Sequence, residues 1–325
     1  MKFLLTIDTE ADNQWEHGID VSVENIKYIP RFQNLCNKYN IKPTYLVTSE
    51  VCDDGFAKEI FRDYSELKNA EIGAHLHSWT TPPFIDQDGL RYNDPSHAFA
   101  SEIPVQLLTE KLKNLSGQIE KSFDIKPTSF RSGRYGFNED VAKVLTDLTY
   151  TVDSSVTPYV SWSANSGLST GTGGPDFIDK TPQPYRYNFA SGSLLEIPIT
   201  ILPTRFPLTL SEKFTGYYFR NVNKSIPLRI LRKLLLSNQP LWLRPHEWMD
   251  INLFTEIFNF SKTNNLPFMV MMFHSSELMP GCSKYRKDGA AIENLYDQLE
   301  SFFNLLQKND IESLTLSDAA KNYSI

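Results

Sequence analysis

The sequence contains few cysteines and no long apolar run. Of its 325 residues only three are cysteine, and they form no C-x-x-C pair. Such an odd and sparse set argues against a disulfide framework and suits a reducing compartment. No segment approaches the ~18 consecutive apolar residues of a transmembrane helix. The apolar stretch Phe3 to Ile7 is too short for a secretion signal, so we expect a cytoplasmic protein.

Basic charge is scarce as well. Lys and Arg total 32 against 39 Asp and Glu, which gives a net charge of −7 and a pI near 5.5. Nucleic-acid binding needs a dense basic face, so we expect no nucleic-acid partner. No Gly-x-Gly-x-x-Gly follows a predicted strand and no Walker loop is present, which argues against a dinucleotide or nucleoside triphosphate site.

Short apolar segments alternate with segments of helical spacing along the whole chain. Strands are predicted at 3–7, 44–48, 71–75, 128–131, 150–153, 194–200, 241–244 and 268–273. Helices are predicted at 24–39, 57–67, 106–123, 139–148, 253–263 and 290–307. This order predicts a parallel α/β sheet, either closed as a barrel or open and doubly wound.

No clean domain boundary interrupts the alternation. We therefore expect one domain over residues 1–325, with a loop-rich excursion at about 157–190. That excursion is rich in Ser, Gly, Thr and Pro, which is typical of an active-site rim.

The segment Ile226 to Leu236 mixes leucines with Arg229, Arg232 and Lys233. Such a helix can pack its leucines on a core, or it can lie on an anionic membrane and contact a lipid-linked substrate there. The sequence leaves both interpretations open.

Two of the six histidines, His75 and His77, follow an apolar strand at a spacing of two. Residues i and i+2 of a strand point to the same face, so both imidazoles can reach one point. Imidazole is a common ligand of zinc and related divalent metals.

Other predicted strands also end in ionisable groups. Asp8 and Glu10 close the first strand, again two residues apart, and His274 closes the last. Ligands of parallel α/β folds gather at the carboxyl ends of strands. Two imidazoles and one carboxylate make a three-ligand metal site and leave one carboxylate as a general base. His274 is placed to protonate a leaving group.

These phrases resemble the polysaccharide deacetylases, the NodB-homology group of metal-dependent carbohydrate esterases (family four), and in particular the branch beside enzymes of surface-polysaccharide biosynthesis. The matching phrases run in the family's order from residue 6 to about residue 280. They are 6–10 (TIDTE), 71–79 (EIGAHLHSW), 129–136 (SFRSGRYG) and 273–278 (FHSSEL).

The resemblance implies a distorted (β/α) barrel of about seven strands and a role for each matching residue. Asp8 would be the general base, with Glu10, His75 and His77 as ligands of a divalent metal, for which we expect zinc. Arg131 would hold the base ionised, and Asp153 would pair with Arg131. His274 would be the general acid. A backbone N–H near Arg134 or Tyr135 would help to stabilise the oxyanion.

The chain departs from the family pattern in three places. Glu10 stands where the family has a second aspartate. The histidines are spaced His-x-His rather than His-x-x-x-His, so that Trp79 occupies the usual second position. In the arginine phrase, Gly133 replaces a common proline after Arg131 and Tyr135 comes one residue later than usual.

The first hypothesis is therefore a metal-dependent hydrolase that removes an acetyl group from a sugar of a surface glycan or its precursor, and we expect that group to be N-acetyl. Candidate substrate contacts are Tyr135, Trp79 and His246, with Trp162 and Trp248 as further stacking candidates. Two alternatives stay open. One is an inactive deacetylase-like protein that binds a glycan or a partner. The other is a glycoside hydrolase that uses two carboxylates.

Overall fold

The structure is a computed structural model. It describes residues 1–12, 21–93, 98–165, 173–204, 212–222, 224–235 and 240–323, and for 212, 213 and 231–235 it describes the backbone only.

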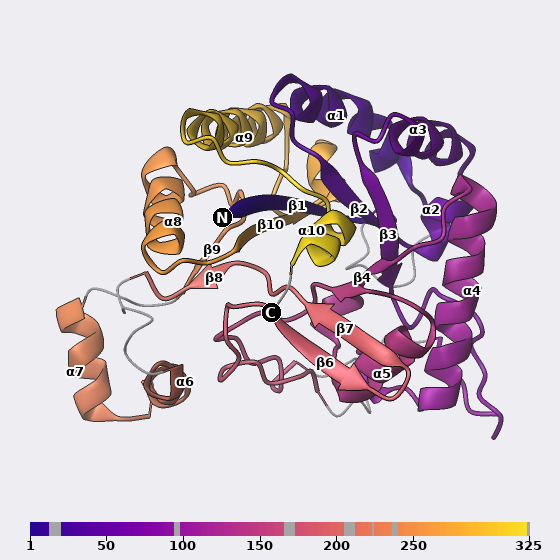
Figure 1. The fold of residues 1–325 in the computed structure, drawn as a ribbon, viewed down its shortest axis with the longest axis horizontal. Coiled ribbons are helices and arrows are strands. Elements are labelled where there is room, and N and C mark those ends of the chain that lie inside the picture. Colours follow the sequence, from indigo (N-terminus) through magenta and orange to yellow (C-terminus); the bar gives the residue numbers. More distant parts are fainter. Residues whose placement is uncertain are drawn as a thin grey trace.

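Eight strands form one curled sheet at the centre of the molecule (Figure 1). The order across the sheet is β10-β1-β2-β3-β4-β5-β7-β6, and only β6 runs antiparallel to its neighbour. The strands are β1 (Lys2–Thr9), β2 (Pro43–Val47), β3 (Glu71–Leu76), β4 (Ser129–Ser132), β5 (Val152–Asp153), β6 (Tyr185–Phe189), β7 (Gly192–Glu196) and β10 (Phe268–His274). Because β1 to β5, β7 and β10 are parallel, their carboxyl ends meet at one edge.

One threonine links the two ends of the parallel strand series. Beyond β7 the backbone N–H of Thr200 donates to the Val270 carbonyl of β10 at 3.2 Å, and the Val270 N–H donates to Thr200 Oγ1 at 2.7 Å. A short antiparallel pair follows, β8 (Ile201–Leu202) with β9 (Leu241–Trp242). The sheet therefore curls into a distorted barrel, and the predicted α/β barrel is confirmed.

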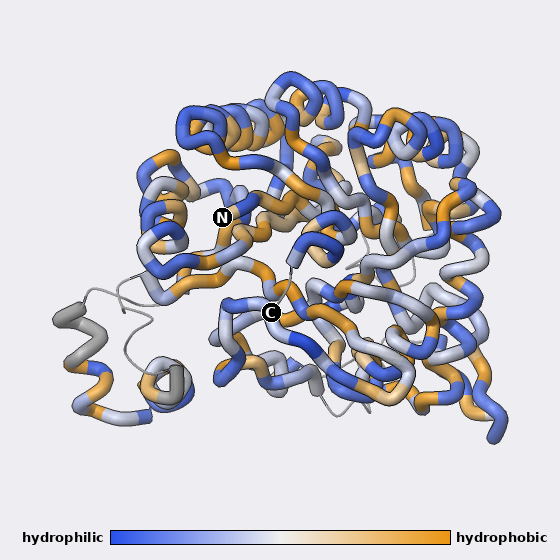
Figure 2. The backbone as a smooth tube through the Cα atoms, in the orientation of Figure 1, coloured by the Kyte–Doolittle hydropathy of each residue, from blue (hydrophilic) through white to orange (hydrophobic). Residues whose placement is uncertain are grey.

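Most of the helices surround the sheet, with their apolar positions on the side toward it, whereas the pair between β8 and β9 lies apart from it at the periphery (Figure 1 and Figure 2). They are η1 (Glu24–Tyr28), α1 (Ile29–Lys38), α2 (Ser49–Asp53), α3 (Gly55–Glu66), η3 (Ala100–Glu102), α4 (Val105–Phe123), η4 (Gly133–Tyr135), α5 (Glu139–Asp147), α6 (Glu212–Asn221), α7 (Ile226–Leu235), α8 (Ile251–Thr263), η5 (Ser275–Leu278), α9 (Gly289–Lys308) and α10 (Leu316–Asn322). The helix predicted over 24–39 is divided into η1 and α1, because Pro30 occupies the first turn of α1, where its missing N–H costs nothing.

The chain between β5 and β6 forms most of the predicted excursion. Its described residues contain no helix, and the bridge between Ser161 and Asp176 ties its two limbs together. Strand β6 begins at Tyr185, inside the predicted limits. Residues 166–172 lie outside the described part.

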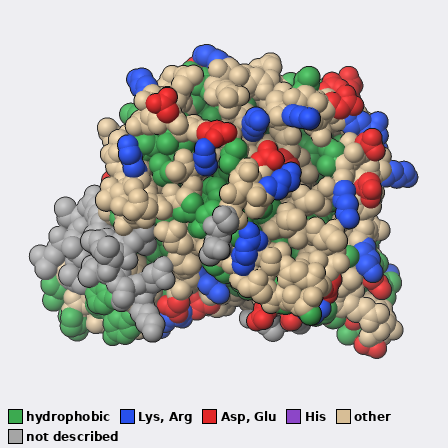
Figure 3. Space-filling view, viewed as in Figure 1, with side chains coloured by type: hydrophobic (Ala, Val, Ile, Leu, Met, Phe, Trp, Pro, Cys, Tyr) green, Lys and Arg blue, Asp and Glu red, His purple; other side chains and the backbone are tan. Residues whose placement is uncertain are grey.

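The face in Figure 3 carries Lys, Arg, Asp and Glu scattered across it and shows no histidine. It is the face on which the N-terminus and the start of β1 lie (Figure 1). The described histidines belong to the opposite edge, where the strands end. No helix in the described part of the chain is long and apolar enough to cross a lipid bilayer.

Candidate active site

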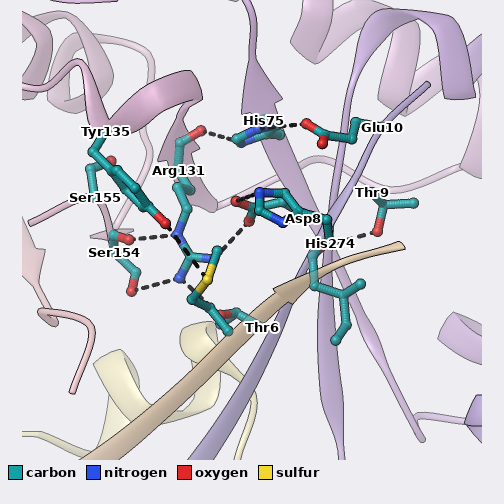
Figure 4. Close-up of polar contacts among 12 residues, drawn as sticks. Thr6, Asp8, Thr9, Glu10, His75, Arg131, Tyr135, Ser154, Ser155 and His274 are labelled. Atoms are coloured by element: carbon teal, nitrogen blue, oxygen red, sulfur yellow. Dashed lines mark hydrogen bonds and ion pairs between the residues drawn. The ribbon is translucent and has the colours of Figure 1, made fainter. Parts of the chain in front are cut away.

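The carboxyl ends of β1, β3, β4 and β10 bring the predicted residues together. Asp8 lies beside His274 in the register of β1 and β10, and His75 lies beside Arg131 in the register of β3 and β4. All four side chains are buried. Parallel pairing thus places groups from distant parts of the sequence in adjacent positions (Figure 4).

Glu10, His75 and His77 form a cluster that could hold a metal ion, with one ligand atom of each residue within 4.8 Å of the others. Glu10 Oε2 lies 2.9 Å from His77 Nε2 and 3.6 Å from His75 Nε2. Tetrahedral ligands at zinc bond lengths are separated by about 3.3 Å, a value between these two. The Oε1 atom of Glu10 is buried without a hydrogen-bond partner. The donor set, the spacing and the orphaned oxygen all fit a divalent metal.

The spacing of the two histidines is explained by the end of β3. His75 is the fifth of the six residues of β3, and His77 follows its last residue, so both rings lie on one side with centroids 4.7 Å apart. His75 Nδ1 lies 2.9 Å from the Arg131 carbonyl, which can only accept, so Nδ1 carries the proton and Nε2 presents a lone pair to the cluster.

Gly133 leaves room for His77. A Cβ atom at this position would lie 2.6 Å from His77 Nδ1 and 2.6 Å from the Leu76 carbonyl oxygen. Real Cβ atoms do not approach so closely. The absence of a side chain at position 133 therefore allows the His77 ring to take this position.

A buried lysine holds the loop that begins at His77. Lys111 of α4 is fully buried, and its Nζ donates to the carbonyls of Ser78 at 2.9 Å and Thr81 at 2.6 Å. Burial lowers the pKa of Lys111 to about 8. Trp79 of this loop packs against His77 with ring centroids 4.5 Å apart, so at least one side of this predicted substrate contact is covered by a candidate metal ligand.

Arg131 orders the predicted base. Its Nη1 donates to Asp8 Oδ1 at 2.7 Å, its Nη2 to Thr6 Oγ1 at 2.8 Å, and its Nε to the Ser154 carbonyl at 2.7 Å (Figure 4). Burial alone would raise the pKa of Asp8, but the Arg131 guanidinium, with His75 and His274, outweighs burial and holds that pKa below its usual value. Asp8 is therefore ionised at neutral pH.

The predicted pairing of Asp153 with Arg131 is wrong. The Asp153 carboxylate accepts from the N–H and hydroxyl of Ser155 at 2.9 and 2.7 Å, and it hydrogen-bonds Glu196, its neighbour in the register of β5 and β7. Burial and the adjacent Asp153 charge raise the pKa of Glu196 well above its usual value. Glu196 is thus protonated and is the hydrogen-bond donor to Asp153. The Arg131 guanidinium donates to Asp8, Thr6 and Ser154 and makes no hydrogen bond to Asp153, which acts on Arg131 only through its charge.

His274 is oriented by two residues to which the sequence assigned no role. Its Nδ1 lies 3.1 Å from Glu277 Oε1 and 3.0 Å from Arg244 Nη2, and Arg244 also donates to Glu277 at 2.5 Å. The ring's other nitrogen, Nε2, points to Asp8 Oδ2 at 4.0 Å. Burial would raise the pKa of Glu277, but Arg244 and His274 lower it to about 2. Glu277 could have been found from the sequence, because it lies three residues after His274 in the turn that follows β10. Arg244 gave no such signal, because it reaches the site from the segment after β9, far from His274 in the sequence.

Tyr135 lies in a strained turn after Arg131. Arg134 and Tyr135 have φ values of 51° and 61°, the left-handed region that non-glycine residues rarely adopt. Consecutive residues of this kind cluster at functional sites. The Tyr135 ring is stacked on Trp162 of the excursion at 5.2 Å, and Trp242 of β9 lies 6.4 Å from Tyr135.

His246 lies on the loop that follows β9. Burial, with the nearby Arg244 charge, lowers its pKa to about 4, so the ring is neutral at neutral pH. It is stacked on Trp248 at 5.3 Å with 11° between the planes, and Trp248 is 60% exposed. Gln298 Nε2 donates to the backbone carbonyls of His246 and Met249 at 2.7 and 2.6 Å, which holds this loop rigidly. Trp248 is thus the exposed member of this aromatic pair, and His246 is half-buried.

Comparison with known proteins rests on structure, because no protein-family model and no curated sequence matches the chain. A protein from Mycobacterium smegmatis that is provisionally assigned as a polysaccharide deacetylase superposes with a TM-score of 0.54 at 13% identity, over 98% of this chain and 88% of its own. The chain has the polysaccharide deacetylase fold.

The same fold carries other chemistry. A 4-alpha-glucanotransferase from Thermococcus litoralis superposes with a TM-score of 0.53 at 13% identity, over 99% of this chain and 40% of the transferase. The fold alone therefore leaves the reaction open, and the site has to decide it.

Proposed function

We propose that the protein is a metal-dependent deacetylase that hydrolyses the N-acetyl group of a sugar in a surface glycan or its lipid-linked precursor. The observation that carries the proposal is the pairing of two distinct units at one sheet edge. One is the Glu10, His75 and His77 cluster, and the other is Asp8 held by Arg131, with His274 Nε2 4.0 Å away.

Each unit has a chemical task. A divalent metal, zinc by its preference for this donor set, would be held by Glu10, His75 and His77 and would supply Lewis-acid activation of the amide carbonyl and of water. Asp8, kept ionised by Arg131, takes the proton of the attacking water. His274 then delivers a proton from Nε2 to the departing sugar nitrogen as the C–N bond breaks, leaving acetate and a free amine.

Three features support an active enzyme acting on a sugar. Asp8 and His274 are both present and face each other, which an inactive binding protein would not require. The half-buried Trp162, which is stacked on the buried Tyr135, and the exposed Trp248 offer flat aromatic faces of the kind that pack on pyranose rings.

Glycoside hydrolysis fits less well. It needs two free carboxylates flanking the scissile bond. Glu10 is engaged by two histidines, and the other carboxylate pair, Asp153 and Glu196, is completely buried.

Acetate release from a panel of N-acetylated sugars and oligosaccharides, after chelation and after addition of zinc, tests the proposal. We expect zinc-dependent release that falls at least 1,000-fold in Asp8→Asn, since the general base and its charge are lost together. The matched control is Asp140→Asn on the exposed side of α5, which should retain full activity. Full activity of Asp8→Asn, or release that zinc does not affect, would refute this mechanism.

A further inference from the structure

Helices α6 and α7 form a small unit, residues 212–222 and 224–235, at the periphery of the molecule, away from the central sheet (Figure 1). The unit has its own apolar contacts, in which Tyr218 and Val222 are buried and Leu228 packs against them. Its inward side is therefore already occupied.

The unit is anchored to the excursion that borders the site. Arg220 forms ion pairs with Asp176 at 2.6 Å and with Asp179 at 2.5 Å, and the Phe219 ring lies 5.5 Å from Tyr159. The same excursion supplies Trp162, which is stacked on Tyr135. A partner surface bound by this unit would therefore lie near the rim of the catalytic centre.

The outward side of the unit exposes large apolar residues. Ile226 is 64% exposed, Ile230 is 55% exposed and Tyr217 is 57% exposed. Ile226 and Ile230 are four residues apart on α7, so they share one face of that helix. Scattered exposed apolar residues are ordinary, but several on one small protruding unit mark a contact surface.

The charge of this region is the reverse of that of the protein. From residue 213 to residue 246 the sequence has seven Lys or Arg and no Asp or Glu, in a chain of net charge −7. Lys224 and Arg229 are exposed beside the two isoleucines. The unit itself contains one acidic residue, Glu212, at the start of α6. Apolar residues interleaved with mainly basic ones are typical of helices that lie in the interface of an anionic membrane.

We propose that the α6–α7 unit docks the protein on the surface of an anionic lipid bilayer, with Ile226, Ile230 and Tyr217 inserted among the lipid headgroups and Lys224 and Arg229 paired with lipid phosphates. A second copy of this chain is a poorer occupant, because two such units would bring like charges together. Docking does not depend on the deacetylase activity, although it would bring a lipid-linked sugar to the rim.

Co-sedimentation of the full-length protein with vesicles tests docking without any substrate. One set of vesicles is phosphatidylcholine and the other contains equal parts of phosphatidylcholine and phosphatidylglycerol. We expect binding to the anionic vesicles that weakens as salt is raised and is at least tenfold weaker on neutral vesicles.

Two double variants separate the contributions. Ile226→Asn with Ile230→Asn should weaken binding at least tenfold, and Lys224→Gln with Arg229→Gln should weaken it about 25-fold, at about fivefold for each charge. Their matched controls replace equally exposed residues elsewhere: Leu67→Asn with Val105→Asn, and Lys113→Gln with Lys126→Gln.

Thermal unfolding by circular dichroism establishes that each variant is folded. The proposal is overturned if the wild type binds both vesicle types equally, or if the α6–α7 variants bind as their controls do. It is also overturned if sedimentation velocity shows a dimer that dissociates in the isoleucine variant while vesicle binding is absent.

Discussion

Replacing Arg131 by Met tests whether the buried ion pair with Asp8 organises the site. Arg131 is fully buried and donates to Asp8, Thr6 and the Ser154 carbonyl, while Asp8 is 3% exposed. Methionine retains an unbranched stem but leaves the Asp8 carboxylate in the interior without its cation. Breaking a buried pair by removing one partner costs about 3–5 kcal/mol, a large share of the roughly 5–15 kcal/mol that stabilises a typical domain.

The pH dependence of this loss has a definite sign. In the wild type Arg131 holds the pKa of Asp8 below its usual value, so the stabilisation is present at neutral pH and is lost only as pH falls below about 4. In Arg131→Met burial is no longer outweighed, and the pKa of Asp8 rises above its value in the unfolded chain. The variant therefore regains stability as pH falls from 7 toward 4, and the gap to the wild type narrows.

Urea unfolding of metal-free protein, followed by fluorescence at several pH values, measures both effects. The control is the double variant Asp8→Asn with Arg131→Met, which removes the stranded charge. Additivity predicts that the double variant loses as much unfolding free energy as the two single variants together. We expect its loss to be smaller than that sum by at least about 2 kcal/mol. A loss below about 1 kcal/mol in Arg131→Met, strict additivity, or a gap that widens at low pH would each refute the reasoning.

Three further predictions concern the neighbouring residues. Zinc at a hundredfold excess over its dissociation constant should stabilise the wild type by about 2.7 kcal/mol in thermal unfolding but should not stabilise His75→Ala. Equal stabilisation of both proteins would contradict the assignment of the metal site. Gly133→Ala should destabilise the protein by about 1–3 kcal/mol and weaken zinc binding in calorimetry, because the added Cβ would overlap His77. Its control is Gly117→Ala, whose Cβ would meet no atom within 4 Å and which should leave zinc binding unchanged. Glu277→Gln should lower the free energy of unfolding in urea by about 3 kcal/mol at pH 7, because the Glu277 pKa of about 2 lies below the usual 4.5. This loss should vanish as pH falls from 4.5 toward 2, and a loss independent of pH would contradict the reasoning.

Local pattern was sufficient for the parallel strands and most of the helices. The uncharged run at 268–273 became β10, which is buried along its whole length, and the 3–7 segment became β1 beside it. Such strands are read from apolar content alone because both of their faces are covered. The antiparallel β6 was missed, since its side chains are mostly half-buried and its Tyr and Phe residues lie in a polar segment.

The site residues were predictable where they end strands. Asp8, Glu10, His75, His77, Arg131 and His274 all lie at the carboxyl edge, because a parallel sheet collects such positions. Partner choice was not predictable. Asp153 lies one strand away from Arg131 yet pairs with Ser155 and Glu196. This pairing depends on the neighbouring Ser154, which already accepts a hydrogen bond from the Arg131 guanidinium.

The cytoplasmic location and the N-acetylated sugar of a surface glycan or its precursor stay predictions. The role of the excursion at about 157–190 as an active-site rim likewise stays a prediction. The stacking of Trp162 on Tyr135 supports it.

The sequence by itself determined the alternation of strands and helices, the residue types at the strand ends and the same-side placement of His75 and His77, because each follows from periodicity within a few residues. Only the tertiary structure decided which of these groups meet. Glu10 reaches the histidines of β3 from β1, Arg131 reaches Asp8 across the sheet, and Arg244 and Glu277 orient His274. These contacts join residues far apart in sequence, and their partners are selected by strand register and by competition for buried hydrogen bonds, neither of which a local pattern encodes.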